Sequence, residues 1–260
     1  MGNPVSTKKN IKRQTRGFLN QRSTLARCED AGGVYQRLLE VGRVGLIGGA
    51  MRELHYGSAR KFRSDLDFVL EVKNERAFER LLHGYKHTRN RFGGYRISTW
   101  SLDIDFWDVR TTWAHTTGLR NVSCLEDVVE TTFFNVDALI YIDAENSLIA
   151  KDGALGAIEE RFLDINLEEN PNPLGAAVRA LRRMHDHNMC VSDTLAAFIS
   201  DQIDEFGWDR MSWQDRFAYP NRPVLQTLAM AIPRSGDEFR ELIDEHSNRL
   251  PKIEQLKLPI

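Results

Sequence analysis

The chain has 260 residues, 42% of them hydrophobic, and its 35 lysines and arginines nearly balance its 37 aspartates and glutamates. This composition is typical of a soluble globular protein and excludes collagen-like, mucin-like and wholly disordered chains. No apolar run approaches the roughly 18 residues that a membrane span needs, and the N-terminus lacks the apolar stretch of a secretory signal. We therefore expect a cytoplasmic protein, with Cys28, Cys124 and Cys190 as reduced thiols because their wide spacing suits neither a zinc knuckle nor a disulfide framework.

The N-terminal segment is basic although the whole chain is nearly neutral. Residues 1–28 carry seven lysines and arginines and no acidic residue, namely Lys8, Lys9, Lys12, Arg13, Arg16, Arg22 and Arg27. Such a run attracts the phosphates of nucleic acid through charge alone. The segment is expected to be a basic flexible arm, either facing a nucleic acid or solvated without a partner.

The pattern of apolar residues divides the rest of the chain into a catalytic part, 29–165, and a helical neck and C-terminal part, 166–260. In the first part, helical spacing over 31–41 precedes a short apolar strand over 44–47, a Gly-Gly turn and a helix from Ala50. A strand over 65–70, a helix over 75–82 and a hairpin of 95–100 with 102–107 follow. In the second part the spacing predicts helices over 174–184, 192–206, 224–231 and 237–246.

Two pairs of aspartates fall on the predicted strands. Side chains at positions i and i+2 of a strand share a face, so Asp65 lies beside Asp67 on one strand and Asp103 beside Asp105 on the hairpin. Either pair alone is often no more than a solvated strand end. Three converging carboxylates, however, form a set of hard oxygen ligands of the kind that Mg²⁺ prefers.

The Gly48-Gly49 turn stands directly upstream of these strands. Neither glycine has a Cβ, so the backbone can approach a ligand closely, and the amides that begin the next helix would point at an anion. Arg52 lies one turn into that helix and can offer a fork of charged donors to a triphosphate. Arg63 and Ser64, in the basic loop before Asp65, are further candidate nucleotide ligands, although this loop could equally be solvated.

Together these motifs resemble the DNA polymerase β-like nucleotidyltransferase superfamily. Gly48-Gly49-Ala50-Met51-Arg52-Glu53 is similar to its GGxxRD signature, and Ser64-Asp65-Leu66-Asp67 to its DxD strand. The stretches 134–141, 151–158 and 179–184 are similar to further segments of the class II branch, which contains the head domains of bacterial poly(A) polymerases and CCA-adding tRNA nucleotidyltransferases. The resemblance covers residues 40 to 190.

The resemblance implies an α+β fold, in which a palm of mixed sheet and flanking helices precedes a small all-helical domain. It also implies two Mg²⁺ ions, with Mn²⁺ as a substitute, bound by Asp65, Asp67 and Asp105. The reaction implied is template-independent transfer of NMP or dNMP from a nucleoside triphosphate to a hydroxyl, with release of pyrophosphate. Asp105 matches the third carboxylate, which helps to activate the attacking hydroxyl, and Asp103 is the reserve candidate.

The sequence also departs from the CCA-adding enzymes. Glu130-Thr131-Thr132 stands where they carry Arg-Arg-Asp, and 168–173 blurs their base-reading neck motif, so nucleotide choice does not carry over. The C-terminal part is short for gripping a tRNA. We expect a nucleic-acid 3′ end as the acceptor; the alternative is an enzyme of a bacterial toxin or antiphage system that modifies a protein or builds an oligonucleotide signal.

Overall fold

The computed structural model describes residues 4–20, 29–57, 62, 65–100, 102–228 and 235–251. The chain divides into two compact units, Met1–Glu159 and Glu160–Ile260. Within the described residues, no helix combines the length and the apolar character needed to cross a bilayer.

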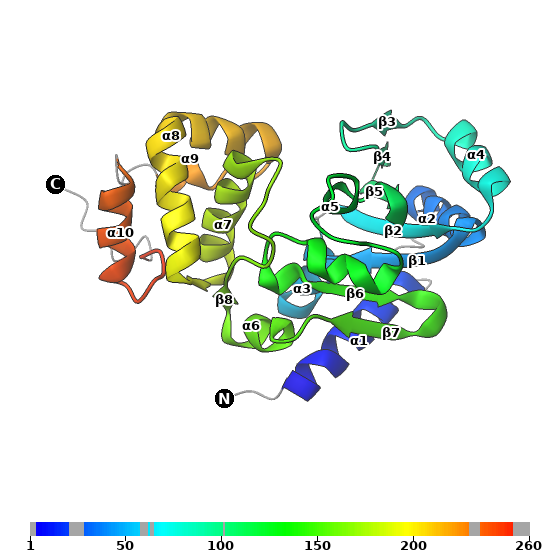
Figure 1. Cartoon of the computed structure of the whole chain (residues 1–260), viewed down its shortest axis with the longest axis horizontal. Helices are drawn as coiled ribbons and strands as arrows, with labels where there is room; N and C mark the ends of the chain where they lie inside the picture. The colour runs from blue at the N-terminus through cyan, green and yellow to red at the C-terminus, as the bar shows by residue number, and fades with distance from the viewer. Residues whose placement is uncertain are drawn as a thin grey trace. The chain divides into compact units, whose positions relative to one another are not determined.

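The first unit is built on a mixed sheet (Figure 1). In its described part the strand order is β3-β4-β5-β2-β1-β6-β7, in which β2 and β5 run parallel and the other neighbours run antiparallel. The strands are β1 (Gly42–Ile47), β2 (Leu66–Val72), β3 (Thr88–Arg89), β4 (Tyr95–Ser98), β5 (Asp103–Asp108), β6 (Leu139–Ile142) and β7 (Ser147–Ala150). The α-helices are α1 (Pro4–Asn20), α2 (Glu29–Val41), α3 (Gly49–Tyr56), α4 (Glu75–Gly84), α5 (Trp113–Thr116) and α6 (Ala154–Glu160).

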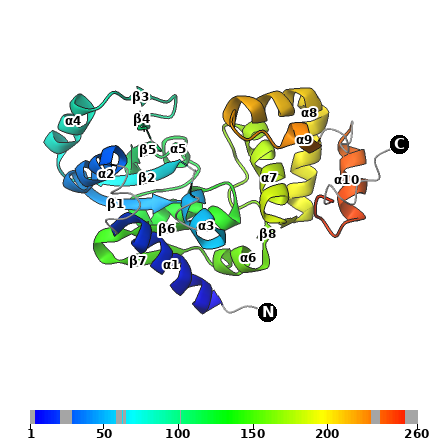
Figure 2. The ribbon, with the colours of Figure 1, turned by 180° about the vertical axis from the view of Figure 1, so that it is seen from behind.

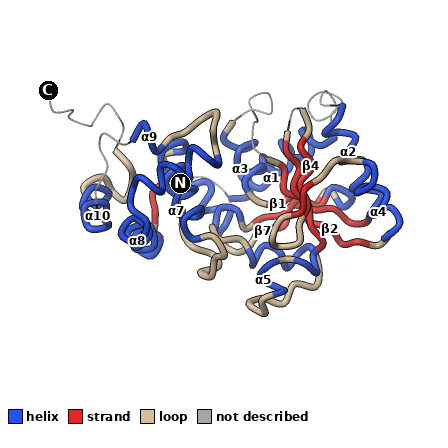
Figure 3. The backbone as a smooth tube through the Cα atoms, turned by 90° about the horizontal axis from the view of Figure 1, so that it is seen from above, coloured by secondary structure: helices blue, strands red, loops and turns tan. Residues whose placement is uncertain are grey.

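The two faces of the sheet are covered differently. Helices α1, α2 and α3 lie on the side that faces the viewer in Figure 2, and α5 lies on the opposite side, as the view along the sheet in Figure 3 also shows. On the first face Tyr35 of α2 stacks on Phe68 of β2, with ring centroids 5.3 Å apart. On the second face an apolar cluster that includes Val69, Leu125 and Ile140 packs under the segment that carries α5. The central strands are therefore buried on both faces, and this packing holds in place the strand ends that carry the aspartates.

The second unit is a helical bundle. It contains α7 (Pro173–His187), α8 (Asp193–Ala218), α9 (Leu225–Leu228) and α10 (Gly236–Asp244), and the parallel pair β8 (Phe162–Leu163) with β9 (Cys190–Val191). Asp215 of α8 is fully buried and accepts hydrogen bonds from Arg182 of α7 and from the backbone N–H groups of Val224 and Leu225. This buried carboxylate ties α7, α8 and the start of α9 together.

The expected α+β class, with a mixed sheet, flanking helices and a helical second unit, is confirmed. The two compact units divide after Glu159, whereas the sequence analysis placed the boundary at residue 165. Phe162–Leu163 pairs with Cys190–Val191, so the second unit contains one short strand pair beside its helices.

The basic arm differs from the expectation. Residues 1–28 were expected to be a flexible arm, but Pro4–Asn20 forms the helix α1, which packs against α3. Ile11, Phe18 and Leu19 are buried on its inner side, so the helix is amphipathic and its lysines and arginines lie between apolar positions. Residues 1–3 and 21–28 lie outside the described part of the chain.

Candidate active site

The glycine turn and the first aspartate strand meet at one end of the sheet. β1 pairs antiparallel with β2, and Ile47, the last residue of β1, lies opposite Asp67. Gly48 follows with φ of +74°, a conformation that favours glycine, and its N–H donates to the carbonyl of Leu139 at 3.3 Å. The start of α3 is thereby set beside the end of the sheet that carries Asp65 and Asp67.

The acidic residues on β2 and β5 are brought together by strand register. Asp67 and Asp105 are directly opposite one another in the parallel β2–β5 pair. Asp65 immediately precedes β2, and Asp103 is the first residue of β5. Strand alternation places Asp65, Asp67, Asp103 and Asp105 on the same face, so the convergence expected from the sequence is present.

Burial, together with neighbouring negative charge, raises the pKa of both Asp65 and Asp67. Burial, followed by the charges of Asp105 and Asp65, raises the pKa of Asp67 from 3.8 to about 7. Burial also raises the pKa of Asp65, and the nearby Arg96 guanidinium opposes that effect. Among the described residues, none donates a hydrogen bond to the side chain of Asp67.

Arg96, which the sequence analysis did not single out, is a cation in direct contact with the cluster. Its Nε donates to Asp105 Oδ1 at 2.7 Å, and its Nη2 donates to Asp65 Oδ2 at 2.9 Å. Its Nη1 lies 3.5 Å from Asp103 Oδ2. Arg96 lies opposite Asp105 in the antiparallel β4–β5 pair, a register that the predicted hairpin did not specify.

Arg52 does not occupy the position expected for a phosphate ligand. Its guanidinium is buried, with 5% of the residue exposed, and it donates to Asp137 in the turn before β6. Arg52 therefore braces the start of α3 against that turn instead of extending from the site. Gly48 and Gly49 do lie at the expected place beside the carboxylates, whereas Arg63 and Ser64 lie outside the described residues.

The donor chemistry of the cluster fits a hard divalent cation. Aspartate oxygens are ligands that Mg²⁺ accepts. A bound cation would also offset the burial and the mutual repulsion that raise the pKa of Asp67. In the described part of the chain, however, no three carboxylate, imidazole or thiol groups already form a cation cage. The guanidinium of Arg96 stands among the oxygens that such a cation would use.

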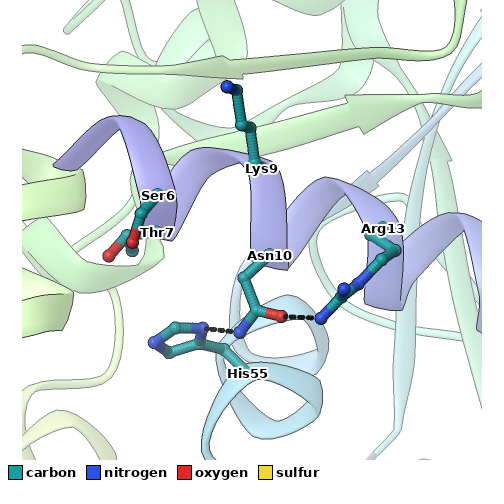
Figure 4. A pocket seen from close by; sticks show the side chains of 6 residues that line it. All are labelled: Ser6, Thr7, Lys9, Asn10, Arg13 and His55. Carbon is teal, nitrogen blue, oxygen red and sulfur yellow. Dashed lines mark hydrogen bonds between the residues drawn. The ribbon is translucent and has the colours of Figure 1, made fainter. Parts of the chain in front are cut away.

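A second feature is a hollow of about 290 Å³ between α1 and α3 (Figure 4). Asn10 lies at its centre: the side-chain oxygen accepts from Arg13 at 2.9 Å, and the side-chain nitrogen lies 3.0 Å from Nδ1 of His55. Because the Asn10 oxygen is used by Arg13, its amide group donates to His55. Ser6, Thr7 and Lys9 complete the lining, so hydroxyl, amide and cationic donors predominate.

Comparison with known proteins identifies the fold but no sequence family. No protein-family model matches the chain, and no curated protein is significantly similar to it in sequence. The chain is similar to the solved structure of a tRNA-processing enzyme with CTP, with 20% identity, a TM-score of 0.51 and coverage of 82% of this chain and 56% of that one. It is also similar to a CCA-adding enzyme in complex with ATP, with 14% identity, a TM-score of 0.52 and coverage of 87% and 56%.

A third similar structure is the Thermotoga maritima CCA-adding enzyme complexed with tRNA, with 15% identity, a TM-score of 0.50 and coverage of 85% and 57%. This chain thus spans little more than half the length of these enzymes. The matches show that the chain shares the fold of these enzymes, as the resemblance of its sequence motifs predicted.

Proposed function

We propose that the protein is a metal-dependent, template-independent nucleotidyltransferase that transfers a nucleotide from a nucleoside triphosphate to the 3′ hydroxyl of a nucleic acid. The observation that carries the proposal is the in-register pair of Asp67 and Asp105, with Asp65 and the Gly48 turn at the same end of the sheet. This arrangement occurs within a fold shared with enzymes that were solved with CTP, ATP and tRNA.

Asp65, Asp67 and Asp105 would hold the Mg²⁺ ions. When bound, the metal neutralises charge on the phosphates and lowers the pKa of the attacking hydroxyl. The Gly48-Gly49 backbone leaves room for the triphosphate beside the start of α3, because neither residue has a Cβ. The role of Arg52 is to hold this turn in place through Asp137.

In the proposed reaction the acceptor oxygen forms a bond to the α-phosphorus while the bond between that phosphorus and the bridging oxygen to the β-phosphorus breaks. Pyrophosphate leaves with the electron pair of the broken bond. Asp105 lies next to Asp67 in the sheet and takes the proton of the acceptor hydroxyl. Atoms and charge balance without a further reactant.

Helix α1 supports a nucleic acid as the acceptor. Its cationic side chains Lys8, Lys9, Lys12, Arg13 and Arg16 have no acidic neighbour within the helix. The adjoining hollow adds hydroxyl and amide donors, which suit phosphate oxygens. Phosphate contacts of this kind bind and orient a strand without reading its sequence.

The proposal is tested by incubating the protein with Mg²⁺ and each of the four labelled NTPs and four dNTPs, with RNA, with oligo-DNA and with neither. Label that extends the added RNA or DNA supports the proposal and identifies the nucleotide. Label on the protein itself, or in a soluble oligonucleotide, would instead support the alternative, a toxin or antiphage enzyme that modifies a protein or builds an oligonucleotide signal. Absence of label under every condition would contradict nucleotidyl transfer.

A further inference from the structure

Arg96 makes contacts that a bound cation would also need. Its guanidinium engages oxygen atoms of Asp65 and Asp105 at 2.9 Å and 2.7 Å and lies 3.5 Å from an oxygen of Asp103. Asp103 and Asp105 belong to β5, and Asp65 immediately precedes β2. One side chain therefore binds three of the four aspartates that the sheet brings together, all but Asp67.

The backbone holds the base of this side chain in place but leaves its head accessible. Arg96 lies opposite Asp105 in the antiparallel β4–β5 pair, so its Cα cannot move away without breaking the ladder. The side chain nevertheless remains 42% exposed to solvent. A long, half-exposed arginine can exchange its partners by rotation about its side-chain bonds while the strand stays paired.

The guanidinium and a divalent ion exclude one another at these oxygens. Both carry positive charge, and both require the lone pairs of Asp65 and Asp105, so simultaneous binding is opposed by repulsion and by competition for ligands. We propose that Arg96 is an internal counter-cation, which holds the carboxylates together in the metal-free protein and releases them when the metal binds. This inference rests on the proposed function, because it assigns the metal to the same carboxylates.

In the metal-free protein, Arg96 therefore neutralises part of the negative charge of the aspartates. The same contacts lower the affinity of these aspartates for a metal ion. Removing the guanidinium should strengthen metal binding and weaken the metal-free fold. A purely structural arginine would instead stabilise both states equally. Metal binding and stability must therefore be measured together.

The experiment titrates Mn²⁺, as the probe, into wild-type protein, R96Q and R96K without nucleotide, following the free-ion signal by electron paramagnetic resonance. Melting temperatures are recorded in EDTA and in saturating Mn²⁺. R110Q is the matched control, because Arg110 also forms bonds from Nε and Nη2 to one aspartate, Asp108, but lies outside the cluster.

We expect R96Q to bind Mn²⁺ about tenfold or more tightly than wild type, since one unit of repelling charge is gone. R96K should fall in between, because lysine keeps the charge but not the planar fork. R96Q should melt lower than wild type in EDTA, and saturating Mn²⁺ should narrow the difference through linkage. R110Q should bind Mn²⁺ as wild type does.

Equal Mn²⁺ affinity in wild type, R96Q and R96K would overturn the inference and leave the proposed function standing. The same conclusion would follow if R96Q lost equal stability with and without Mn²⁺. Failure of every variant to bind Mn²⁺ would instead refute the metal dependence on which both rest. If R96Q does not fold, the comparison of R96K with wild type decides the matter.

Discussion

Asp67 and Asp105 lie directly opposite one another on the parallel strands β2 and β5. Two carboxylates in this position repel each other, and sheets normally avoid like charges in cross-strand pairs. Burial adds to the cost and contributes the largest part of the upward shift in the pKa of Asp67. An arrangement that is unfavourable for stability is understandable if the pair binds cations during function.

The structure separates the roles of Asp105 and Asp103. Asp105 is in register with Asp67, whereas Asp103 begins β5 two positions earlier, opposite Ser98 of β4. We expect D105N to lower kcat more than about a hundredfold, in the range for removal of a group that stabilises transition-state charge. D103N should remain within a few fold of wild type. Steady-state rates of pyrophosphate release compare the two variants, and a larger loss in D103N would reverse the assignment.

The raised pKa of Asp67 predicts how stability depends on pH. The folded protein holds a proton up to about pH 7 at a group that loses it near 3.8 in the reference state. Between these values the folded state binds more protons than the unfolded state, so Asp67 makes the free energy of unfolding fall as pH rises towards 7.

D67N removes this titration. In EDTA we expect D67N to melt higher than wild type at pH 8, with the difference shrinking towards pH 5, where Asp67 is protonated in the folded protein. Thermal melts at several pH values measure the effect. If D67N were less stable than wild type at pH 8, the ionised Asp67 carboxylate would not destabilise the folded protein, and the prediction would be wrong.

The buried pair of Arg52 and Asp137 predicts a loss of stability rather than of substrate binding. Replacing Arg52 with methionine leaves the Asp137 carboxylate without this partner, and breaking a buried ion pair costs about 3–5 kcal/mol. R52M should therefore unfold at lower urea concentration, and R52M combined with D137N should recover part of the loss. An unchanged unfolding midpoint together with a higher KM for the nucleotide would instead make Arg52 a phosphate ligand.

Helix α1 predicts that nucleic-acid binding depends on salt. If Lys9 and Arg13 contact phosphates of a single-stranded RNA, K9A and R13A should each reduce the slope of log K against log salt by about 0.7. Fluorescence anisotropy of a labelled RNA over a series of KCl concentrations gives these slopes. The control is R80A, which removes an exposed arginine from α4. Equal slopes for all four proteins would exclude α1 from the binding surface.

Much of the site could be predicted from local patterns. The alternation around Asp65 and Asp67 and the apolar run that ends at Gly48 are direct consequences of strand geometry, and both appear in the structure as expected. The fold class was implied by the resemblance of these motifs to a known superfamily. These features depend on residues that are close together in the sequence.

The errors concern contacts between distant residues. Arg52 was expected to face a ligand, but its partner Asp137 lies 85 positions away, and spacing gives no indication of such a pair. The basic segment was expected to be flexible because charge dominated its composition, yet Ile11, Phe18 and Leu19 are sufficient to bury one side of a helix. Arg96 was missed because its importance appears only when the hairpin register is combined with the parallel β2–β5 pairing.

The central claim is that the carboxylates on β2 and β5 perform nucleotidyl transfer. The most direct measurement compares wild type with D67N for Mg²⁺-dependent pyrophosphate release that matches, mole for mole, the nucleotide added to an acceptor. The account predicts matched release and addition in wild type and neither in D67N, although D67N should be the more stable protein at pH 8 when metal is absent. Undiminished transfer by a folded D67N protein would contradict it.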